Sequence, residues 1–285
     1  MTRRAYYGYM GVAVLALGAM PFFKKAAVEA GLGAYPLALV VALAAALGAW
    51  VLVRATGAPA YLPRRVWPHL ALIGVLAAGV VVLINALALT STSATNQSLF
   101  QAMYPSSTLL FAWLVLGERL RPAHYAMIVV MSLGVLLVNS DDGALALGAG
   151  FWLLLATLPI MGFCDAYAKR TMAQVGPDQV AVGRFAFGAL LLVLLFPMAR
   201  AGDWDALGVA WPWAALGGAM TALGVFALYR ALRVQKAGVV GALVATAPVL
   251  TALLEATFLG QVFAPWQVAG VALVVAGAAL LALRA

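Results

Sequence analysis

The sequence predicts an all-helical integral membrane protein in which ten transmembrane helices form two inverted five-helix repeats, with both termini in the cytoplasm. Three observations predict this class. The 285 residues are 66% hydrophobic and only 9% charged, whereas soluble domains average about 25% charged residues, so the chain lacks the polar surface to cover a globule in water. Apolar runs of membrane-spanning length follow one another, and a pattern of prolines and glycines repeats after 143 residues.

The apolar runs are long enough to be helices, since roughly 20 apolar residues are needed to cross the hydrocarbon. They are too long for barrel strands and lack period-two alternation. Several links are short, such as "GLGAYP" and "GQVFAP", so consecutive helices are expected to be antiparallel neighbours. The ten predicted spans are 6–28, 34–54, 67–89, 95–116, 123–139, 148–169, 178–199, 211–232, 237–259 and 265–283.

The basic residues orient these spans, because cytoplasmic loops carry an excess of lysine and arginine. With the N-terminus inside, only Lys24, Lys25 and Arg200 fall on the outer side, and Arg184 lies within a span. We therefore expect a multi-pass protein of a bacterial-type inner membrane with both termini cytoplasmic. The basic residues on the expected inner side are Arg3, Arg4, Arg54, Arg64, Arg65, Arg119, Arg121, Lys169, Arg170, Arg230, Arg233, Lys236 and Arg284.

The two halves of the chain align when one is shifted by 143 positions. Each half holds five predicted helices, and because five is odd the second half enters the membrane from the opposite side. This arrangement is an inverted-topology repeat, the common architecture of secondary transporters. We expect a first repeat over 1–139, an outer linker over 140–147 and a second repeat over 148–285. The matched positions are Pro105 with Pro248, Leu116-Gly117 with Leu259-Gly260, Pro122 with Pro265, and Gly134 with Gly277.

The motifs of the two halves are similar to those of a known family. The segment "YPSSTLLFAWLVLGERLRPAHYAMIVVMSLGVLLV" and its second copy "APVLTALLEATFLGQVFAPWQVAGVALVVAGAALL" resemble the ten-helix EamA-type exporters of the drug/metabolite transporter superfamily. The resemblance covers about 8–138 and 147–283, with Gln261 standing where the family usually has glutamate. It implies transport of small metabolites, often outward, without indicating which one.

Four prolines lie well inside predicted spans, away from the span ends, and we expect each to break its helix. Pro105 cannot donate a backbone hydrogen bond, so the carbonyl four residues earlier, that of Gln101, loses its partner. In lipid such a carbonyl must be satisfied by something else, which favours helices that face protein or a wet cavity. A kink needed only for packing is the alternative. The other three prolines are Pro21, Pro159 and Pro248.

Polar side chains in the fourth span follow the spacing of one helix face. They are spaced four, three and four residues apart, and the ninth span carries mostly apolar residues at the same offsets. We expect these residues to line a substrate cavity suited to an amphipathic organic solute, while hydrogen bonding between helices is the alternative. The expected lining residues are Gln97, Gln101, Tyr104 and Thr108, with Thr251 from the ninth span.

Charged residues within spans are costly, so partners are expected for them. Asp165 and Arg184 lie at similar depths above the inner side, which predicts an inner ion pair. Lys24 and Glu255 lie near the outer side and form the predicted outer pair. Both pairs could act as gates or as folding anchors. Glu255 and Asp165 are also the only acids within spans that could couple transport to protons.

Motifs of other function classes are missing from the sequence. HExxH, GxSxG, Walker A and GxGxxG do not occur, and the single cysteine, Cys164, cannot form a disulfide within the chain. His69 and His124 lie at span ends without companions for a metal site. The charges lie between apolar runs rather than in a patch, which argues against nucleic acid as a partner. An enzyme is therefore not expected, and neither a cofactor nor a metal.

We therefore expect a secondary transporter that moves a small organic metabolite by alternating access and exports amino acids or similar amphipathic compounds. An exchanger or importer of a phosphorylated, nucleotide-like or vitamin-like solute is the alternative within this class, and a channel is the alternative outside it. The expected partners are the solute and the lipid bilayer, with protons left open. The chain is expected to be a monomer or a weak homodimer.

Overall fold

The computed structural model describes residues 3–57, 61–116, 122–141, 144–145, 147–199, 201–233, 240 and 243–284. Within these ranges the protein is helical apart from one small antiparallel hairpin. Its strands, β1 (Ser140–Asp141) and β2 (Ala144–Leu145), pair Ser140 with Leu145 and lie in the segment that connects the two halves. Four of the basic residues that orient the spans, Arg119, Arg121, Arg200 and Lys236, lie outside the described residues.

The helices of the first half follow the first five predicted spans. The third span is interrupted by a π-helical stretch, which leaves backbone groups in an irregular pattern and is frequently found at functional sites. The fourth span is divided into two helices. In chain order the elements are α1 (Arg3–Glu29), α2 (Ala34–Ala55), η1 (Arg64–Val66), α3 (Trp67–Ile73), the π-helix η2 (Gly74–Val80), α4 (Val81–Leu89), α5 (Ala94–Ala102), α6 (Tyr104–Leu116) and α7 (Pro122–Val138).

The second half repeats this plan. Across the described residues, six helical stretches are long and apolar enough to cross a membrane, and further apolar helices are shorter. The shorter helices fall where the remaining four spans are predicted. The elements of this half are α8 (Ala149–Met172), α9 (Pro177–Leu194), η3 (Phe196–Met198), η4 (Ala201–Trp204), α10 (Leu207–Leu232), α12 (Ala247–Phe258) and α13 (Pro265–Arg284).

The four prolines have two different effects on their helices. Pro105 is the second residue of α6 and Pro248 is the second residue of α12, so both helices begin one residue before the proline, as the repeat predicts. The predicted breaks at Pro21 and Pro159 are wrong, because α1 and α8 continue through them. Proline removes one hydrogen bond, and the remaining backbone groups of a helix in lipid have no competing partners that would favour unwinding.

Glycines at the helix crossings show that the halves pack on each other in equivalent ways. A Cβ atom on Gly18 of α1 would lie 3.1 Å from the Cβ atom of Leu250 on α12. A Cβ atom on Gly162 of α8 would lie 2.3 Å from Ser107 Oγ on α6. The two glycines are 144 residues apart, and their two neighbours are 143 apart. Each half thus places its first helix against the broken helix of the other half.

A second crossing is duplicated in the same way. A Cβ atom on Gly74 would lie 2.7 Å from the carbonyl oxygen of Arg184, and one on Gly218 would lie 2.4 Å from that of Val41. Both pairs of positions are related by the repeat shift. These exchanged contacts relate the two halves by an approximate two-fold axis.

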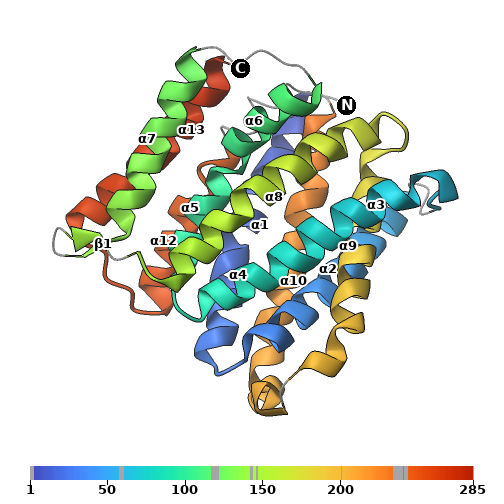
Figure 1. The fold of residues 1–285 in the computed structure, drawn as a ribbon, viewed down its shortest axis with the longest axis horizontal. Helices are drawn as coiled ribbons and strands as arrows, with labels where there is room; N and C mark the ends of the chain where they lie inside the picture. Colours follow the sequence, from blue (N-terminus) through green and yellow to red (C-terminus); the bar gives the residue numbers. More distant parts are fainter. Residues whose placement is uncertain are drawn as a thin grey trace.

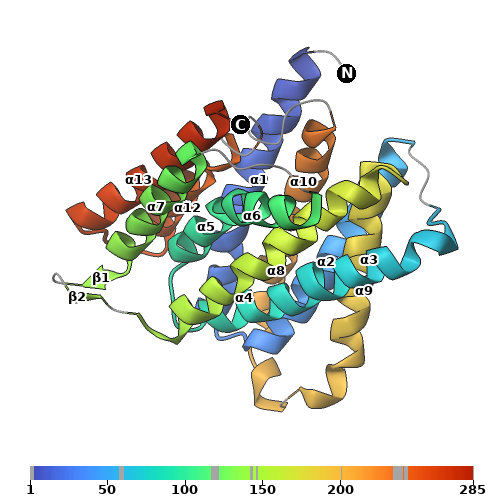
Figure 2. The same ribbon diagram turned by 45° about the horizontal axis from the view of Figure 1, so that its top comes forward.

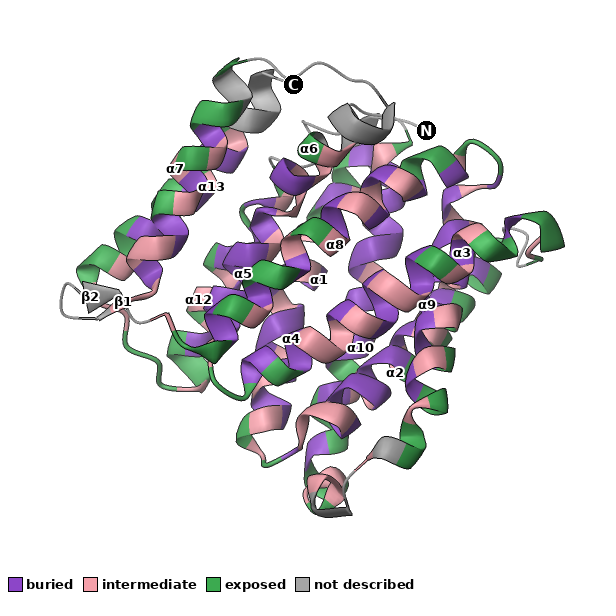
Figure 3. Cartoon of the chain, in the orientation of Figure 1, coloured by how far each residue is buried: buried purple, intermediate pink, exposed green. Residues whose placement is uncertain are grey.

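Helices α7 and α13 form a pair at one side of the bundle (Figure 1). They cross where a Cβ atom on Gly134 would lie 2.6 Å from the carbonyl oxygen of Gly270. Figure 3 shows exposed residues along α7, and Tyr125 and Val129 of this helix are about half exposed. The two chain ends lie toward the same end of the bundle in both ribbon views (Figure 2), as expected for an even number of crossings.

Candidate functional site

A cluster of polar side chains lies buried where the two halves meet. Tyr104, at the start of α6, places its hydroxyl 3.2 Å from the hydroxyl of Thr157 on α8. Asn85 of α4 lies beside Tyr104 and is 5% exposed, and its Oδ1 atom accepts no hydrogen bond from the described residues. Tyr104 is held in this position because α6 begins at it, so the helix break directs the side chain toward the opposite half.

An arginine-centred group lies next to this cluster. Arg184 of α9 is 6% exposed, and its Nη1 atom lies 3.3 Å from Asp165 Oδ1 and 2.7 Å from the hydroxyl of Tyr229 on α10. The predicted pairing of Asp165 with Arg184 is therefore present in the structure, and its role as a gate stays a prediction. The backbone of Arg184 packs against Gly74, the first residue of the π-helix η2.

The two groups form one site. Tyr104 packs against a buried cluster that contains Met161 and Tyr229, two residues that contact the guanidinium group of Arg184. The side chains come from α4 and α6 of the first half and from α8, α9 and α10 of the second half. Such a site between repeats is where secondary transporters bind their solutes.

The other residues of the predicted polar face have different surroundings. Gln97 is completely buried, and neither its amide oxygen nor its amide nitrogen has a hydrogen-bond partner within the described part of the chain. Gln101 is half-buried. The hydroxyl of Thr108 donates to the carbonyl of Tyr104 within the same helix, so it satisfies part of the backbone at the helix break.

Thr251 connects helices in this conformation. Its side chain is fully buried, and its hydroxyl contacts the carbonyl oxygen of Gly18 at 2.6 Å and Ser98 Oγ at 2.9 Å. Hydrogen bonds between helices, the alternative interpretation of its polarity, account for these contacts. Thr251 joins α12 to α1 and α5, and its predicted role in binding solute stays untested.

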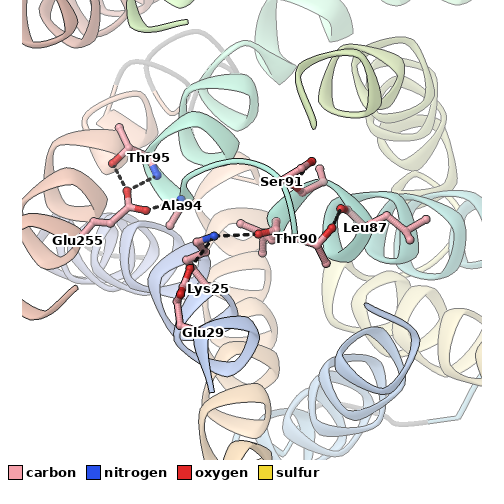
Figure 4. Close-up of polar contacts among 10 residues, drawn as sticks. Lys25, Glu29, Leu87, Thr90, Ser91, Ala94, Thr95 and Glu255 are labelled. Atoms are coloured by element: carbon pink, nitrogen blue, oxygen red, sulfur yellow. Dashed lines mark hydrogen bonds and ion pairs between the residues drawn. The ribbon is translucent and has the colours of Figure 1, made fainter. Parts of the chain in front are cut away.

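Glu255 caps the N-terminus of α5 and does not pair with Lys24 (Figure 4). Its carboxylate accepts hydrogen bonds from the backbone N–H groups of Ala94 at 2.7 Å and Thr95 at 2.8 Å, and from the Thr95 hydroxyl at 2.6 Å. The next N–H group, that of Asn96, donates to the Ser93 hydroxyl. The unpaired N–H groups at the start of a helix attract negative charge, so these donors satisfy the carboxylate.

The predicted ion pair between Lys24 and Glu255 is therefore wrong for this conformation. Lys24 is buried at 4% exposure and forms no ion pair with the described acids. Its side chain lies over Gly217 of α10. The neighbouring Lys25 pairs with Glu29 at 2.8 Å, as Figure 4 shows. It also donates to the carbonyl of Leu89.

An apolar groove of about 580 Å³ runs beside the polar site. It lies between α6, α7 and α8, and its lining includes Met103, which directly precedes Tyr104, and Ala156 and Leu158, which flank Thr157. Some lining residues face outward, since Trp152 is 56% exposed. The polar site is thus bordered by apolar surface. Residues that line the groove include Met103, Ser106, Leu110, Leu155, Ala156 and Leu158.

Sequence reasoning missed three residues of the site: Asn85, Thr157 and Tyr229. Asn85 could have been found, because it is the one polar residue in the apolar run "VVLINALAL", and polar residues within spans are by default functional candidates. Thr157 and Tyr229 carry no comparable signal. Their importance depends on which helices face each other, and span counting does not predict that.

Comparisons with known proteins agree with this arrangement. The model of the EamA-like transporter family matches twice, over residues 5–140 and 148–283. A solved crystal structure, described only as that of a protein, has 20% sequence identity and a TM-score of 0.69, and the match covers 100% of this chain and 99% of the other. No curated protein matches the chain. The two family matches span nearly all of the sequence, and the chain therefore belongs to the EamA-like transporter family, as a multi-pass integral membrane protein built from two copies of the family unit.

Proposed function

We propose that the protein is a secondary transporter that moves a small organic metabolite by alternating access and exports amino acids or similar amphipathic compounds. The observation that carries this proposal is the buried polar site shared by the two halves. Membership of the family supports transport in general, and the site supplies the polar groups that would orient a solute. In this proposal the termini are cytoplasmic and the membrane is a bacterial-type inner membrane, following the positive-inside rule.

The chemistry of the site suits a solute with a polar head and an apolar body. Tyr104, Thr157 and Asn85 offer hydroxyl and amide groups, while the adjoining groove offers apolar surface. Rocking one half against the other would expose this site to each side in turn. Because Tyr104 belongs to one half and Thr157 to the other, such a movement would change their contact directly.

The test is solute flux in reconstituted vesicles loaded with a mixture of metabolites. A carrier gives flux that saturates and shows counterflow, whereas a channel gives neither. We expect Tyr104→Phe to lower flux about fivefold to tenfold, since one hydrogen bond contributes about 1 kcal/mol. Tyr125→Phe is the matched control, because Tyr125 is half exposed on α7. Equal flux in both variants, or flux without saturation, would refute the proposal.

Proton coupling is tested in the same vesicles. Asp165 is paired with Arg184 and Glu255 is bound to the start of α5, so each carboxylate already has stabilising partners. Collapse of the pH gradient with flux unchanged would exclude coupling through either acid.

A further inference from the structure

One edge of the Arg184 guanidinium group has no oxygen acceptor within the described residues. Arginine carries five N–H donors in a planar fork. The Nη1 atom of Arg184 reaches Asp165 and Tyr229. The Nη2 atom contacts only the sulfur of Met161, at 3.6 Å, and Nε has no partner within the described residues although it is buried. The edge formed by Nε and Nη2 therefore lacks a proper acceptor.

A second arginine of the same protein shows what this edge binds. Arg230 directs its Nε atom to Asp178 Oδ1 and its Nη2 atom to Asp178 Oδ2, both at 2.9 Å. Its Nη1 atom donates to the hydroxyl of Tyr9 at 2.8 Å. The fork of Arg230 is thus filled by a carboxylate in the two-pronged geometry that arginine prefers. Arg184 has the tyrosine on Nη1 as well, but not the carboxylate on the Nε–Nη2 edge.

We propose that the Nε–Nη2 edge of Arg184 binds the carboxylate group of the transported solute, an inference that rests on the proposed function. A buried donor without a partner is unfavourable, and a carboxylate supplies both missing acceptors at once. Met161 leaves room by rotation, because its unbranched side chain adapts to its surroundings. The solute thereby replaces a weak sulfur contact with two charge-assisted hydrogen bonds.

The charge of the site favours one negative charge on the solute rather than two. Asp165 already lies against Arg184, so the formal charges of the pair cancel. A carboxylate adds one negative charge, whereas a phosphate monoester adds nearly two beside the existing acid. The local charge therefore selects a monocarboxylate over the phosphorylated alternative.

Asn85 completes the recognition of the solute. Its Oδ1 atom is a buried acceptor without a hydrogen-bond donor in the described structure. The Asn85 side chain neighbours Tyr104, and Tyr104 packs against the buried cluster that contains Met161 and Tyr229, which contact Arg184. A solute that carries an amine or amide N–H group in addition to its carboxylate satisfies this atom. The ligand class is thus a monocarboxylate with an N–H donor.

The test measures binding to the full chain in detergent, by the shift of the thermal unfolding midpoint with ligand concentration. The probes are straight-chain, branched and aromatic carboxylic acids, each with and without an α-amine and each paired with its primary amide and with a phosphate ester of the same shape. We expect acids to bind at least tenfold more tightly than their amides and phosphate esters. Equal binding of acid and amide, tighter binding of the phosphate esters, or no shift with any acid would overturn the inference.

Substitutions at Arg184 test whether its side chain binds the carboxylate. Arg184→Lys keeps the charge but loses the fork, and we expect at least a tenfold loss of acid affinity. Arg230→Lys is the control and should change acid affinity less than twofold. The double variant Asp165→Asn/Arg184→Gln avoids a buried unpaired charge and should bind acid and amide alike, whether or not Arg184→Lys folds. Unchanged acid affinity in either Arg184 variant would overturn the assignment.

The amine preference tests the second contact. Asn85→Ala should remove the advantage of an amine-bearing acid over the plain acid, and an equal loss of affinity for both probes would refute the role of Asn85. Binding is measured without flux, so carboxylate binding in a protein that transports nothing would refute the proposed function alone. Transport restricted to solutes without a carboxylate would refute only this inference.

Discussion

Replacement of Glu255 should loosen the start of α5 by a predictable amount. The carboxylate accepts three hydrogen bonds from Ala94 and Thr95 and is 1% exposed. Hydrogen bonds to a charged group contribute about 1.5–3 kcal/mol each. Glu255→Gln keeps one acceptor oxygen and loses the charge, so we expect a cost of about 2 kcal/mol. Glu255→Ala loses all three bonds and should cost about 4 kcal/mol or more.

These costs are measurable as thermal unfolding midpoints in detergent. For a chain of this size 1 kcal/mol corresponds to about 2 °C, so the expected decreases are about 4 °C for glutamine and about 8 °C for alanine. Hydrogen exchange should also become faster at the amides of Ala94 and Thr95, because those groups lose their acceptor. Peptides elsewhere in the chain should exchange as in the unaltered protein.

The matched control is Glu29→Gln, since Glu29 pairs with Lys25 at a side chain that is 55% exposed. Exposed ion pairs contribute about 0–1 kcal/mol, so its midpoint should fall by no more than about 2 °C. If Glu255→Gln were no less stable than Glu29→Gln, and the amides at the start of α5 exchanged at the original rate, the carboxylate would not be what holds this helix.

Two further substitutions test the contacts between the halves. Gly162→Ala places a Cβ atom against Ser107 at 2.3 Å and should cost about 1–3 kcal/mol by overpacking. Gly11→Ala has open space inside α1 and should not lower the midpoint; equal midpoints would contradict the close crossing. Thr251→Val removes the hydroxyl that donates to the Gly18 carbonyl and should lower the stability by about 1 kcal/mol. A denaturation series measures this loss, and an unaltered midpoint would show that the bond does not stabilise the protein.

The broken helices could be predicted only in part from the sequence, because proline is a local cause that does not decide alone whether a helix divides. Pro105 and Pro248 both lie where a helix starts afresh, and the repeat shift alone relates the two positions. Pro21 and Pro159 are chemically the same residue, yet their helices continue. A proline limits only its own hydrogen bond, so whether the helix divides there depends on the neighbouring backbone and on what packs around it.

The site is only partly predictable for a similar reason. Tyr104 can be found because polar residues at helical spacing are visible in one sequence. The acceptor role of Glu255 cannot, because its main partners are the backbone N–H groups of Ala94 and Thr95, and every sequence contains such groups without a motif to mark them. Matching charged residues by their depth in the membrane identifies the pair Asp165 and Arg184 on adjacent helices. The same matching gives a wrong partner for Glu255, because backbone N–H groups compete with Lys24 for its carboxylate.

Glu255, the residue of α12 that caps α5, has no acidic counterpart in the first repeat. The position that corresponds to it under the repeat shift is Ala112. Under the proposed mechanism, the halves exchange conformations when the carrier turns from one side of the membrane to the other. Contacts present in both halves then contribute equally before and after the exchange. A contact present once does not, and a difference of about 2 kcal/mol favours one orientation about thirtyfold. Under the proposed mechanism, the Glu255 contact would favour the conformation that contains it, and so the side of the membrane to which that conformation opens.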